Sequence, residues 1–396
     1  MKIILPCDNY IYRIKGVYHS KSQEELDLFK RYLRVFDKIR LIARCSEESE
    51  QKSTYVPIED GRIEIIPLPM FRGPFQYLRN ISNIKKAIKH VYEGVDAGVL
   101  RLPSIMGSQI GYGLIKRKIP YVTENLFDSQ DGYMSSDRLL EKLLWMFMDY
   151  LQRHLCYRAE GVSCVTQDYM QRRYFSKKPN SFYSYYSTLA LNSSFYTSAR
   201  KFPYQKSTYC ITHIASPVVT SGRKGHKQMI LVLKAVREKG LNVILKFVGD
   251  GPKSEEIKLQ KLADANGVGN SVFFLGYLSK AQIKSLLVDS DIFAMPTKAE
   301  GLPRVVIEAM SVGLPCISSR VSGLPELLQG HFLTDYHDVD AISKLVVELL
   351  TTPELYEITS RENYEKSKEY EASLLESRRD EFYLSLRNII KESWQR

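Results

Sequence analysis

Short apolar runs alternate with amphipathic segments along the chain, and this pattern predicts two successive series of strands and helices. In the first half, runs typical of buried strands lie at Lys2–Leu5, Lys38–Ala43, Ile63–Pro67, Gly98–Leu102, Tyr121–Glu124 and Gly161–Val165. Helical periodicity falls between them, at Glu24–Val35, Ile81–Tyr92, Ile105–Lys118 and Arg138–Arg158. Strands that alternate with helices favour an α/β fold with a parallel sheet.

A stretch rich in Ser, Tyr and Asn, residues 181–198, separates this series from a second one. In the second series, strands are expected at Tyr209–Ala215, Val243–Val248, Val272–Leu275, Ile292–Met295 and Cys316–Ser318. The last segment, Tyr370–Trp394, has the pattern of a charged amphipathic helix. We therefore expect domains at residues 1–200 and 201–369, followed by a C-terminal helix at 370–396.

The most apolar helical segment is Leu-Leu-Trp-Met-Phe-Met at residues 143–148. It is flanked by Glu141, Lys142 and Asp149, and no apolar run in the sequence approaches the length that spans a bilayer. We expect a core helix here rather than a membrane element.

The stretch from Pro296 to Pro315 predicts a strand end, a tight loop and a nearly all-apolar, buried helix. Three polar residues interrupt the helix, Arg304, Glu308 and Ser311, and their spacing places them on one face. The free amides of Arg304 and Val305 and the positive end of the helix dipole suit a phosphate. Glu300 in the loop and Glu308 two turns later could each hold hydroxyl groups beside it.

These residues carry a family resemblance. Glu300 and Glu308 form the E-x7-E motif of the retaining glycosyltransferases of family 4, which the stretch Gly249 to Glu326 also resembles. The resemblance implies the GT-B fold, in which two Rossmann-like domains with parallel sheets face a central cleft. It also implies a nucleotide-diphosphate sugar as donor, with UDP-sugars favoured, retention of anomeric configuration, and no bound metal or other cofactor.

The resemblance places the donor site in the second domain. Glu300 would hold sugar hydroxyls and Glu308 the ribose, while Lys224 and the helix start would hold the diphosphate. The family usually has an arginine after the first strand of this domain, where Ser216-Pro217 stand here, and Arg223 is the candidate replacement. Further donor-binding candidates complete this set: Gly301, Leu302, Arg304, Val305, Gly249 and Leu278.

In the first domain, the loop from Asp8 to Ser20, with Gly16, resembles the glycine-containing loop of the family near the reacting phosphate. Arg101 at a strand end suits an anionic acceptor or a diphosphate. Glu124 stands where many relatives have a histidine. It is either a base that positions the acceptor or a structural carboxylate, and the sequence does not decide between them.

Charge is uneven along the chain: residues 1–200 hold 30 Lys and Arg against 21 Asp and Glu, a difference of +9. This basic half favours an anionic partner, either a lipid-linked phosphate acceptor or an anionic membrane surface. The basic residues of 71–89, which include Lys85, Lys86 and Lys89, and those of 172–178 are candidate contacts. No nucleic-acid module is recognisable. Six cysteines without a C-x-x-C pair indicate thiols in a reducing cytoplasm.

The expected function is a retaining hexosyl- or N-acetylhexosaminyl-transferase that acts on a glycan or lipid-linked acceptor in bacterial surface polysaccharide biosynthesis. It would be cytoplasmic and peripheral at the inner face of the cell membrane. Two alternatives stay open: a non-catalytic nucleotide-sugar binding subunit, and a GT-B epimerase or phosphorylase. The D-x-D at Asp289-Ser-Asp291 precedes a strand, so we expect a structural role for it instead of a metal site.

Overall fold

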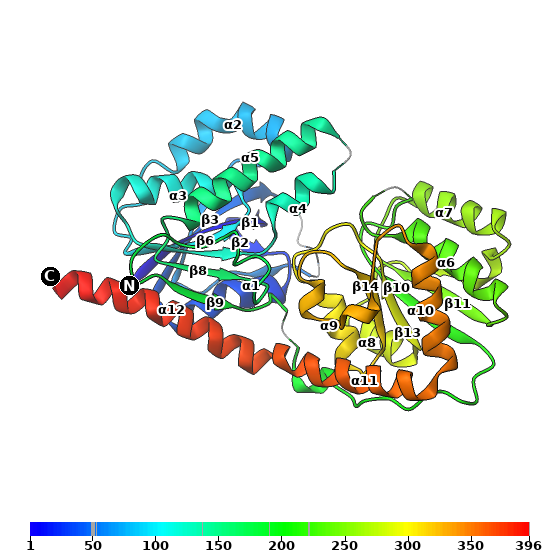
Figure 1. Cartoon of the computed structure of the whole chain (residues 1–396). Helices are drawn as coiled ribbons and strands as arrows, with labels where there is room; N and C mark the ends of the chain where they lie inside the picture. The colour runs from blue at the N-terminus through cyan, green and yellow to red at the C-terminus, as the bar shows by residue number, and fades with distance from the viewer. Residues whose placement is uncertain (49–51, 53, 137, 190, 221, 396) are drawn as a thin grey trace. The chain divides into compact units, whose positions relative to one another are not determined.

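The computed structural model describes residues 1–48, 52, 54–136, 138–189, 191–220 and 222–395. The chain forms two compact units. Unit 1 comprises Met1–Tyr133, Arg138–Tyr186 and the C-terminal residues from Glu376 onward, and unit 2 comprises Met134–Asp137 and Ser187–Leu375. Each unit contains a parallel sheet flanked by helices (Figure 1), as the α/β pattern predicts.

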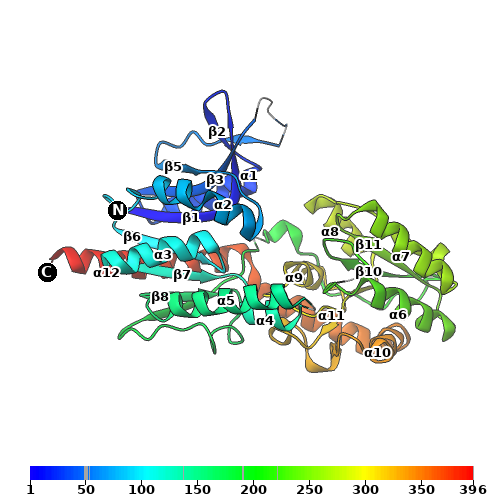
Figure 2. The same ribbon diagram turned by 90° about the horizontal axis from the view of Figure 1, so that it is seen from above.

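A nine-stranded sheet forms the centre of unit 1, and its parallel part has the order β5-β3-β1-β6-β7-β8-β9. Its strands are β1 (Lys2–Ile14), β2 (Val17–Ser20), β3 (Lys38–Glu47), β4 (Val56–Pro57), β5 (Ile63–Leu68), β6 (Ala97–Leu102), β7 (Tyr121–Asn125), β8 (Gly161–Cys164) and β9 (Phe182–Tyr185). Helices α2 (Gly73–Ala87), α3 (Ile105–Arg117) and α5 (Leu139–Cys156) cover one face, and α1 (Gln23–Lys30) and α12 (Ala372–Gln395) lie on the other (Figure 2).

The segment Asp8 to Ser20 is a β-hairpin and not the expected loop. Strand β1 continues to Ile14 through an irregularity at residues 8–9 and pairs antiparallel with β2, with Ile14 opposite Val17. The two-residue turn is Lys15-Gly16, and both residues have positive φ, 48° and 86°. Such a turn favours glycine, so the local fold gives Gly16 a structural reason to be glycine.

Helix α5 forms where it was predicted, but it is not the core helix that its composition suggested. Met148, Leu151 and Leu155 are buried against the sheet, whereas the opposite face of the helix is apolar and open to solvent. Its exposed large apolar residues are Leu139, Leu140, Leu143, Leu144, Met146, Phe147 and Tyr150. None of the helices in the described ranges is long and apolar enough to cross a membrane.

Unit 2 is built on six parallel strands in the order β12-β11-β10-β13-β14-β15. They are β10 (Tyr209–Ile214), β11 (Val243–Val248), β12 (Val272–Phe274), β13 (Ile292–Met295), β14 (Cys316–Ser319) and β15 (Leu333–Thr334). The helices are α6 (His226–Glu238), α7 (Lys253–Ala265), α8 (Lys280–Asp289), α9 (Arg304–Ser311), α10 (Val339–Thr351) and α11 (Pro353–Ser367). A core of Val, Ile, Leu and Phe side chains joins β10, β11 and β13 to α6, α7 and α10.

The compact units divide at Ser187, ahead of the expected boundary at residue 200. The reason is that the segment before β10 is bonded into unit 2. The Arg200 guanidinium donates to the carbonyl oxygens of Val312, Ser290 and Leu287, at 2.6–2.8 Å. Hydrogen bonds from a polar side chain to backbone carbonyls leave no apolar signal in the sequence, so the predicted first domain extended to residue 200.

Candidate functional site

The candidate site of unit 2 lies at the carboxyl ends of its strands. The central strand β10 has β11 on one side and β13 on the other, so the order in which successive strands are added along the sheet reverses there. In open parallel sheets, ligands bind at such a switch point. The loops that follow β10 and β13 contain Lys224 and Glu300, and the amide of Lys298 donates to the Arg223 carbonyl at 2.9 Å. Ser221, at the start of the first loop, is outside the described residues.

Lys224 and Glu300 form an ion pair across these loops. Their side chains are 24% and 14% exposed. The Glu300 amide donates to the Ser322 hydroxyl at 3.1 Å, and the Gly301 carbonyl accepts from the Gly323 amide at 3.1 Å, so the loop after β14 fixes the Glu300 backbone. The structure thus pairs two residues that the sequence analysis had assigned to different parts of the donor, Lys224 to the diphosphate and Glu300 to the sugar.

Glycine is required beside Lys224 and after β11. Gly225 has φ of 70°, and a Cβ there would lie 2.2 Å from the Pro296 carbonyl oxygen. Gly249 has φ of 146°, and a Cβ there would lie 2.2 Å from the Ala215 carbonyl oxygen. Side chains at these positions would push adjacent loops apart. Both glycines therefore keep the strand-end loops in contact.

Helix α9 presents Glu308 in an unusual state for a carboxylate. It is half-buried, and burial raises its pKa, against the opposing charges of Arg304 and Lys280. Within the described ranges its carboxylate forms no hydrogen bond or ion pair. The predicted polar stripe ends at Glu308, because the Ser311 side chain is buried and donates to the Glu308 carbonyl at 2.8 Å.

The state of Glu308 gives a testable expectation. The resemblance implies that Glu308 holds the ribose of the donor nucleotide, so Glu308→Gln is predicted to weaken the binding of UDP by about 1–3 kcal/mol through loss of a hydrogen bond to a charged group. The same change should leave the free energy of unfolding unchanged or higher, because a half-buried carboxylate without a direct hydrogen bond or ion pair carries a desolvation cost. Isothermal calorimetry with UDP and urea unfolding measure the two quantities. Weaker binding with an equal loss of stability would indicate a structural role.

The loops after β11 and β12 surround a small hollow of about 20 Å³, lined by Phe247, Gly249, Gly251, Phe274 and Gly276 among others. The Gly249 amide donates to the Gly276 carbonyl at 3.0 Å, which joins the two loops. Leu278 is half-buried near this edge. The residue at the expected arginine position, Ser216, accepts from the Asp250 amide at 3.1 Å and so bridges the loops after β10 and β11.

Two buried histidines beneath the Lys224 loop were not recognised from the sequence. The rings of His213 and His226 lie 4.8 Å apart, and each packs against Phe247. Burial lowers the pKa of His226 to about 4 and that of His213 well below its ordinary value, so both are neutral near pH 7. They support the backbone on which Lys224 is placed. The one feature of the sequence that could have indicated them is the position of His226, two residues after Lys224.

The D-x-D segment lies at the amino ends of the strands, as its position before β13 indicated. Asp291 accepts from the Cys210 amide at 2.8 Å and pairs with Lys206 at 2.6 Å, so its role in the fold is structural. In the described part of the chain, no group of three His, Cys, Asp or Glu side chains is arranged to hold a metal ion.

In unit 1, Glu124 is fully engaged by its neighbours. It is 4% exposed, and it accepts hydrogen bonds from Tyr32 at 2.8 Å, from Tyr186 at 3.0 Å and from Tyr383. Burial would raise the pKa of Glu124, but the nearby Arg101 charge and the phenol groups hold it below its ordinary value. This geometry favours the structural alternative, because the carboxylate has little capacity left to accept a proton from a substrate.

Arg101 belongs to the same cluster, with its Nε 3.5 Å from the Glu124 carboxylate and 17% of its side chain exposed. Its first role is therefore to balance the buried charge of Glu124. Gly16 lies in the β1–β2 turn, away from this cluster in the sequence and in the sheet. The roles of Arg101 and Gly16 toward a ligand stay predictions.

The model of the family described as Glycosyl transferases group 1 matches residues 217–366, which include the Lys224 loop, Glu300 and Glu308. Residues 217–366 are thus similar to a glycosyltransferase group 1 domain. This domain spans most of unit 2, from the loop after β10 to the end of α11. The carboxyl-end loops described above therefore fall within the part of the chain that matches this family.

Curated relatives extend the match. The chain is similar to the protein CapJ of Staphylococcus aureus, with 23% identity across 99% of this chain and 97% of CapJ. It is 33% identical to the sulfoquinovosyl transferase SQD2 of Arabidopsis thaliana over 39% of this chain and 30% of SQD2. It is 28% identical to the putative colanic acid glycosyltransferase WcaL of Escherichia coli, over 35% and 36%. The chain thus spans about a third of the last two relatives.

Solved structures agree on the fold. A sucrose-phosphate synthase from Thermosynechococcus elongatus superposes with a TM-score of 0.73 at 14% identity, covering 98% of this chain and 100% of that one. The Anabaena protein HepE, in complex with UDP and glucose, gives 0.65 at 16% identity, covering 97% and 100%. The chain therefore has the GT-B fold, with two Rossmann-like domains.

Proposed function

We propose that this glycosyltransferase transfers a hexosyl or N-acetylhexosaminyl group from a nucleotide-diphosphate sugar to a glycan or lipid-linked acceptor. The transfer retains anomeric configuration and serves the synthesis of a bacterial surface polysaccharide. The observation that carries the proposal is the Lys224–Glu300 pair at the switch point, together with the half-buried Glu308 on the helix that follows the Glu300 loop. A UDP-sugar is the favoured donor, because the neighbour HepE is solved with UDP and with UDP-glucose.

Each group has a distinct task in this proposal. Lys224 and the amides at the start of α9 neutralise the diphosphate, on which negative charge grows as the sugar bond breaks. Glu300 holds the sugar hydroxyls and keeps the Lys224 ammonium in place. Glu308 accepts from the ribose. The similarity to WcaL, a putative colanic acid biosynthesis glycosyltransferase, supports a glycan acceptor.

A two-step experiment tests this function. Thermal shifts with UDP-, GDP- and dTDP-sugars identify the donor, because a ligand that binds only the folded state raises the melting temperature. Proton NMR of the product with that donor then reports the anomeric configuration. Stabilisation by a nucleotide sugar without turnover on any acceptor would instead favour a binding subunit. Conversion of the donor without an acceptor would favour an epimerase or phosphorylase.

Turnover is expected to be indifferent to metal chelation. The reason is that the Asp289 and Asp291 pair lies at the amino edge of the sheet, where Asp291 is already bonded to Lys206. The rate should be compared before and after treatment with EDTA. An activity that EDTA removes and Mn²⁺ or Mg²⁺ restores would contradict the expectation.

A further inference from the structure

One face of α5 carries a continuous stripe of side chains that the donor site does not use. Its members recur at intervals of four and three residues, so they lie on one side of the helix. They are Leu139, Leu143, Met146, Tyr150, Arg153 and, at the C-cap, Tyr157. The first four are 73%, 54%, 52% and 56% exposed. The stripe thus begins as an exposed apolar surface and ends with a cation and a tyrosine.

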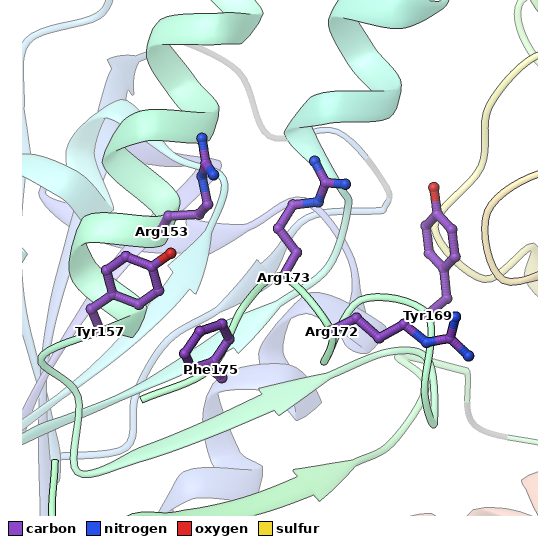
Figure 3. Close-up of a pocket in the computed structure, with 6 residues that line it drawn as sticks. All are labelled: Arg153, Tyr157, Tyr169, Arg172, Arg173 and Phe175. Atoms are coloured by element: carbon purple, nitrogen blue, oxygen red, sulfur yellow. The ribbon is translucent and has the colours of Figure 1, made fainter. Parts of the chain in front are cut away.

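The last two residues of the stripe line a pocket of about 360 Å³ that lies wholly in unit 1. The other lining residues come from the segment after β8: Tyr169, Arg172, Arg173 and Phe175. Figure 3 shows the guanidinium groups of Arg153 and Arg173 pointing in the same direction, with the rings of Tyr157 and Phe175 beside their stems. These two ring centroids are 5.2 Å apart.

Buried carboxylates hold two of the arginines in position. Arg153 pairs with Asp149 at 2.8 Å and Arg173 with Asp128 at 3.6 Å. Both aspartate side chains are almost fully buried, while the arginine side chains are 43% and 31% exposed. A guanidinium has five N–H donors, and one carboxylate accepts at most two of them in a fork. The remaining donors suit an anionic group such as a phosphate.

More exposed apolar residues lie on α5 and on α2, on the same side of the sheet as the stripe (Figure 2). Leu140 and Phe147 on α5 are 69% and 51% exposed, and Phe75 and Leu78 on α2 are 77% and 60% exposed. Helices α2 and α5 cover the same face of the unit 1 sheet (Figure 2). Soluble monomers rarely expose large apolar patches without a binding partner.

We propose that this face of unit 1 docks on an anionic phospholipid surface, with α5 in the plane of the membrane interface. The apolar stripe enters the acyl region, and the arginine pocket holds a lipid phosphate. The charges agree with this partner, because residues 1–200 carry an excess of nine positive charges. An in-plane helix with an apolar face and flanking cations binds membranes in this way. Docking is a property of unit 1 and goes beyond the proposed transfer reaction.

The test is co-sedimentation with phosphatidylcholine vesicles that contain or lack phosphatidylglycerol. The full chain should bind the anionic vesicles, and the variant Leu143→Ser with Met146→Ser should bind at least about tenfold less. Arg153→Gln and Arg172→Gln should each reduce binding about fivefold, since one cation near an anionic surface contributes about that much. High salt should reduce binding of the unmodified chain.

Matched controls separate docking from general surface effects. Ile257→Ser removes an apolar side chain that is 48% exposed on α7 of unit 2, and Arg62→Gln removes a surface arginine paired with Asp60. Neither control should change vesicle binding. The thermal shift caused by UDP should be the same in all variants, so that a failure of docking is distinct from a failure of the proposed function.

Three outcomes would overturn the proposal. Equal binding to neutral and anionic vesicles would show that the arginine pocket does not recognise an anionic lipid. Binding of inorganic diphosphate at the arginines, without any binding to vesicles, would make the pocket a site for a soluble anion. A dimer in analytical ultracentrifugation that the double serine variant dissociates, again without vesicle binding, would assign the apolar face to a second copy of the chain.

Discussion

Glu300→Gln is expected to lower kcat by about 100-fold or more, the range found when one preorganised electrostatic contact to a transition state is removed. Glu300 lies beside the amides at the start of α9 and pairs with Lys224. A carboxylate there contacts the sugar, whose charge and position change as its bond breaks. Affinity for UDP should stay the same or rise, because Gln leaves the Lys224 ammonium to the diphosphate. Steady-state kinetics with the identified donor, together with calorimetry with UDP, measure both effects.

The control for Glu300→Gln is Glu348→Gln, which breaks a surface ion pair with His331 in the same unit. It should change neither kcat nor the affinity for UDP. A Glu300 variant that loses UDP affinity in proportion to its loss of kcat/KM would show uniform binding instead of transition-state stabilisation. If the Glu300 variant kept the full kcat, Glu300 would have no role in the reaction.

Glu124→Gln is expected to lower the free energy of unfolding of unit 1 by about 3–5 kcal/mol, as when one partner of a buried ion pair is removed. The change leaves Arg101 without its counter-ion among the phenols of Tyr32, Tyr186 and Tyr383. Both tryptophans of the chain, Trp145 and Trp394, lie in unit 1. Urea unfolding followed by tryptophan fluorescence therefore reports this unit selectively.

The acid sensitivity of unit 1 provides a second readout for Glu124. Its pKa in the folded protein is below the usual value of 4.5, so it contributes stability above pH 4.5 that is lost as the pH falls toward the folded pKa. Gln cannot titrate, and the variant should lose less stability between pH 5 and acid pH than the unmodified protein. Glu376→Gln, which breaks an exposed pair with Arg34, should cost at most about 1 kcal/mol. If Glu124→Gln left the unfolding curve unchanged and altered the kcat or KM for the acceptor, Glu124 would act in the reaction and not in the stability of the fold.

The strands of unit 2 could be predicted closely because they are parallel and buried on both faces. Val243–Val248 and Ile292–Met295 have the bounds that their apolar runs indicated. The extension of β1 could not be predicted in this way, because Asp8 and Asn9 interrupt the apolar run where the pairing with β3 becomes irregular. The spacing of apolar residues in the sequence thus predicts regular strands, and it does not predict a strand that continues through a polar, irregular segment.

Site residues were predictable where the chemistry is local in sequence. The loop that contains Glu300 and the helix that contains Glu308 are adjacent, so their spacing carries the signal. Glu124 was a candidate base because it ends a strand, and nothing near it in the sequence indicates the tyrosines that occupy it from positions 32, 186 and 383. The exposure of α5 was missed for a related reason: its apolar composition is the same whether a face is covered or open.

The contact between Tyr383 and Glu124 also bears on biosynthesis. A ribosome delivers the chain from its N-terminus, and domains commonly complete their folding in that order. Here every strand of unit 2, up to Leu333–Thr334, has been synthesised before Tyr383 exists. Unit 1 keeps a buried carboxylate short of one partner, and a sheet face short of α12, until residues 376–395 arrive. The first half of the gene therefore encodes the part of the protein that finishes folding last.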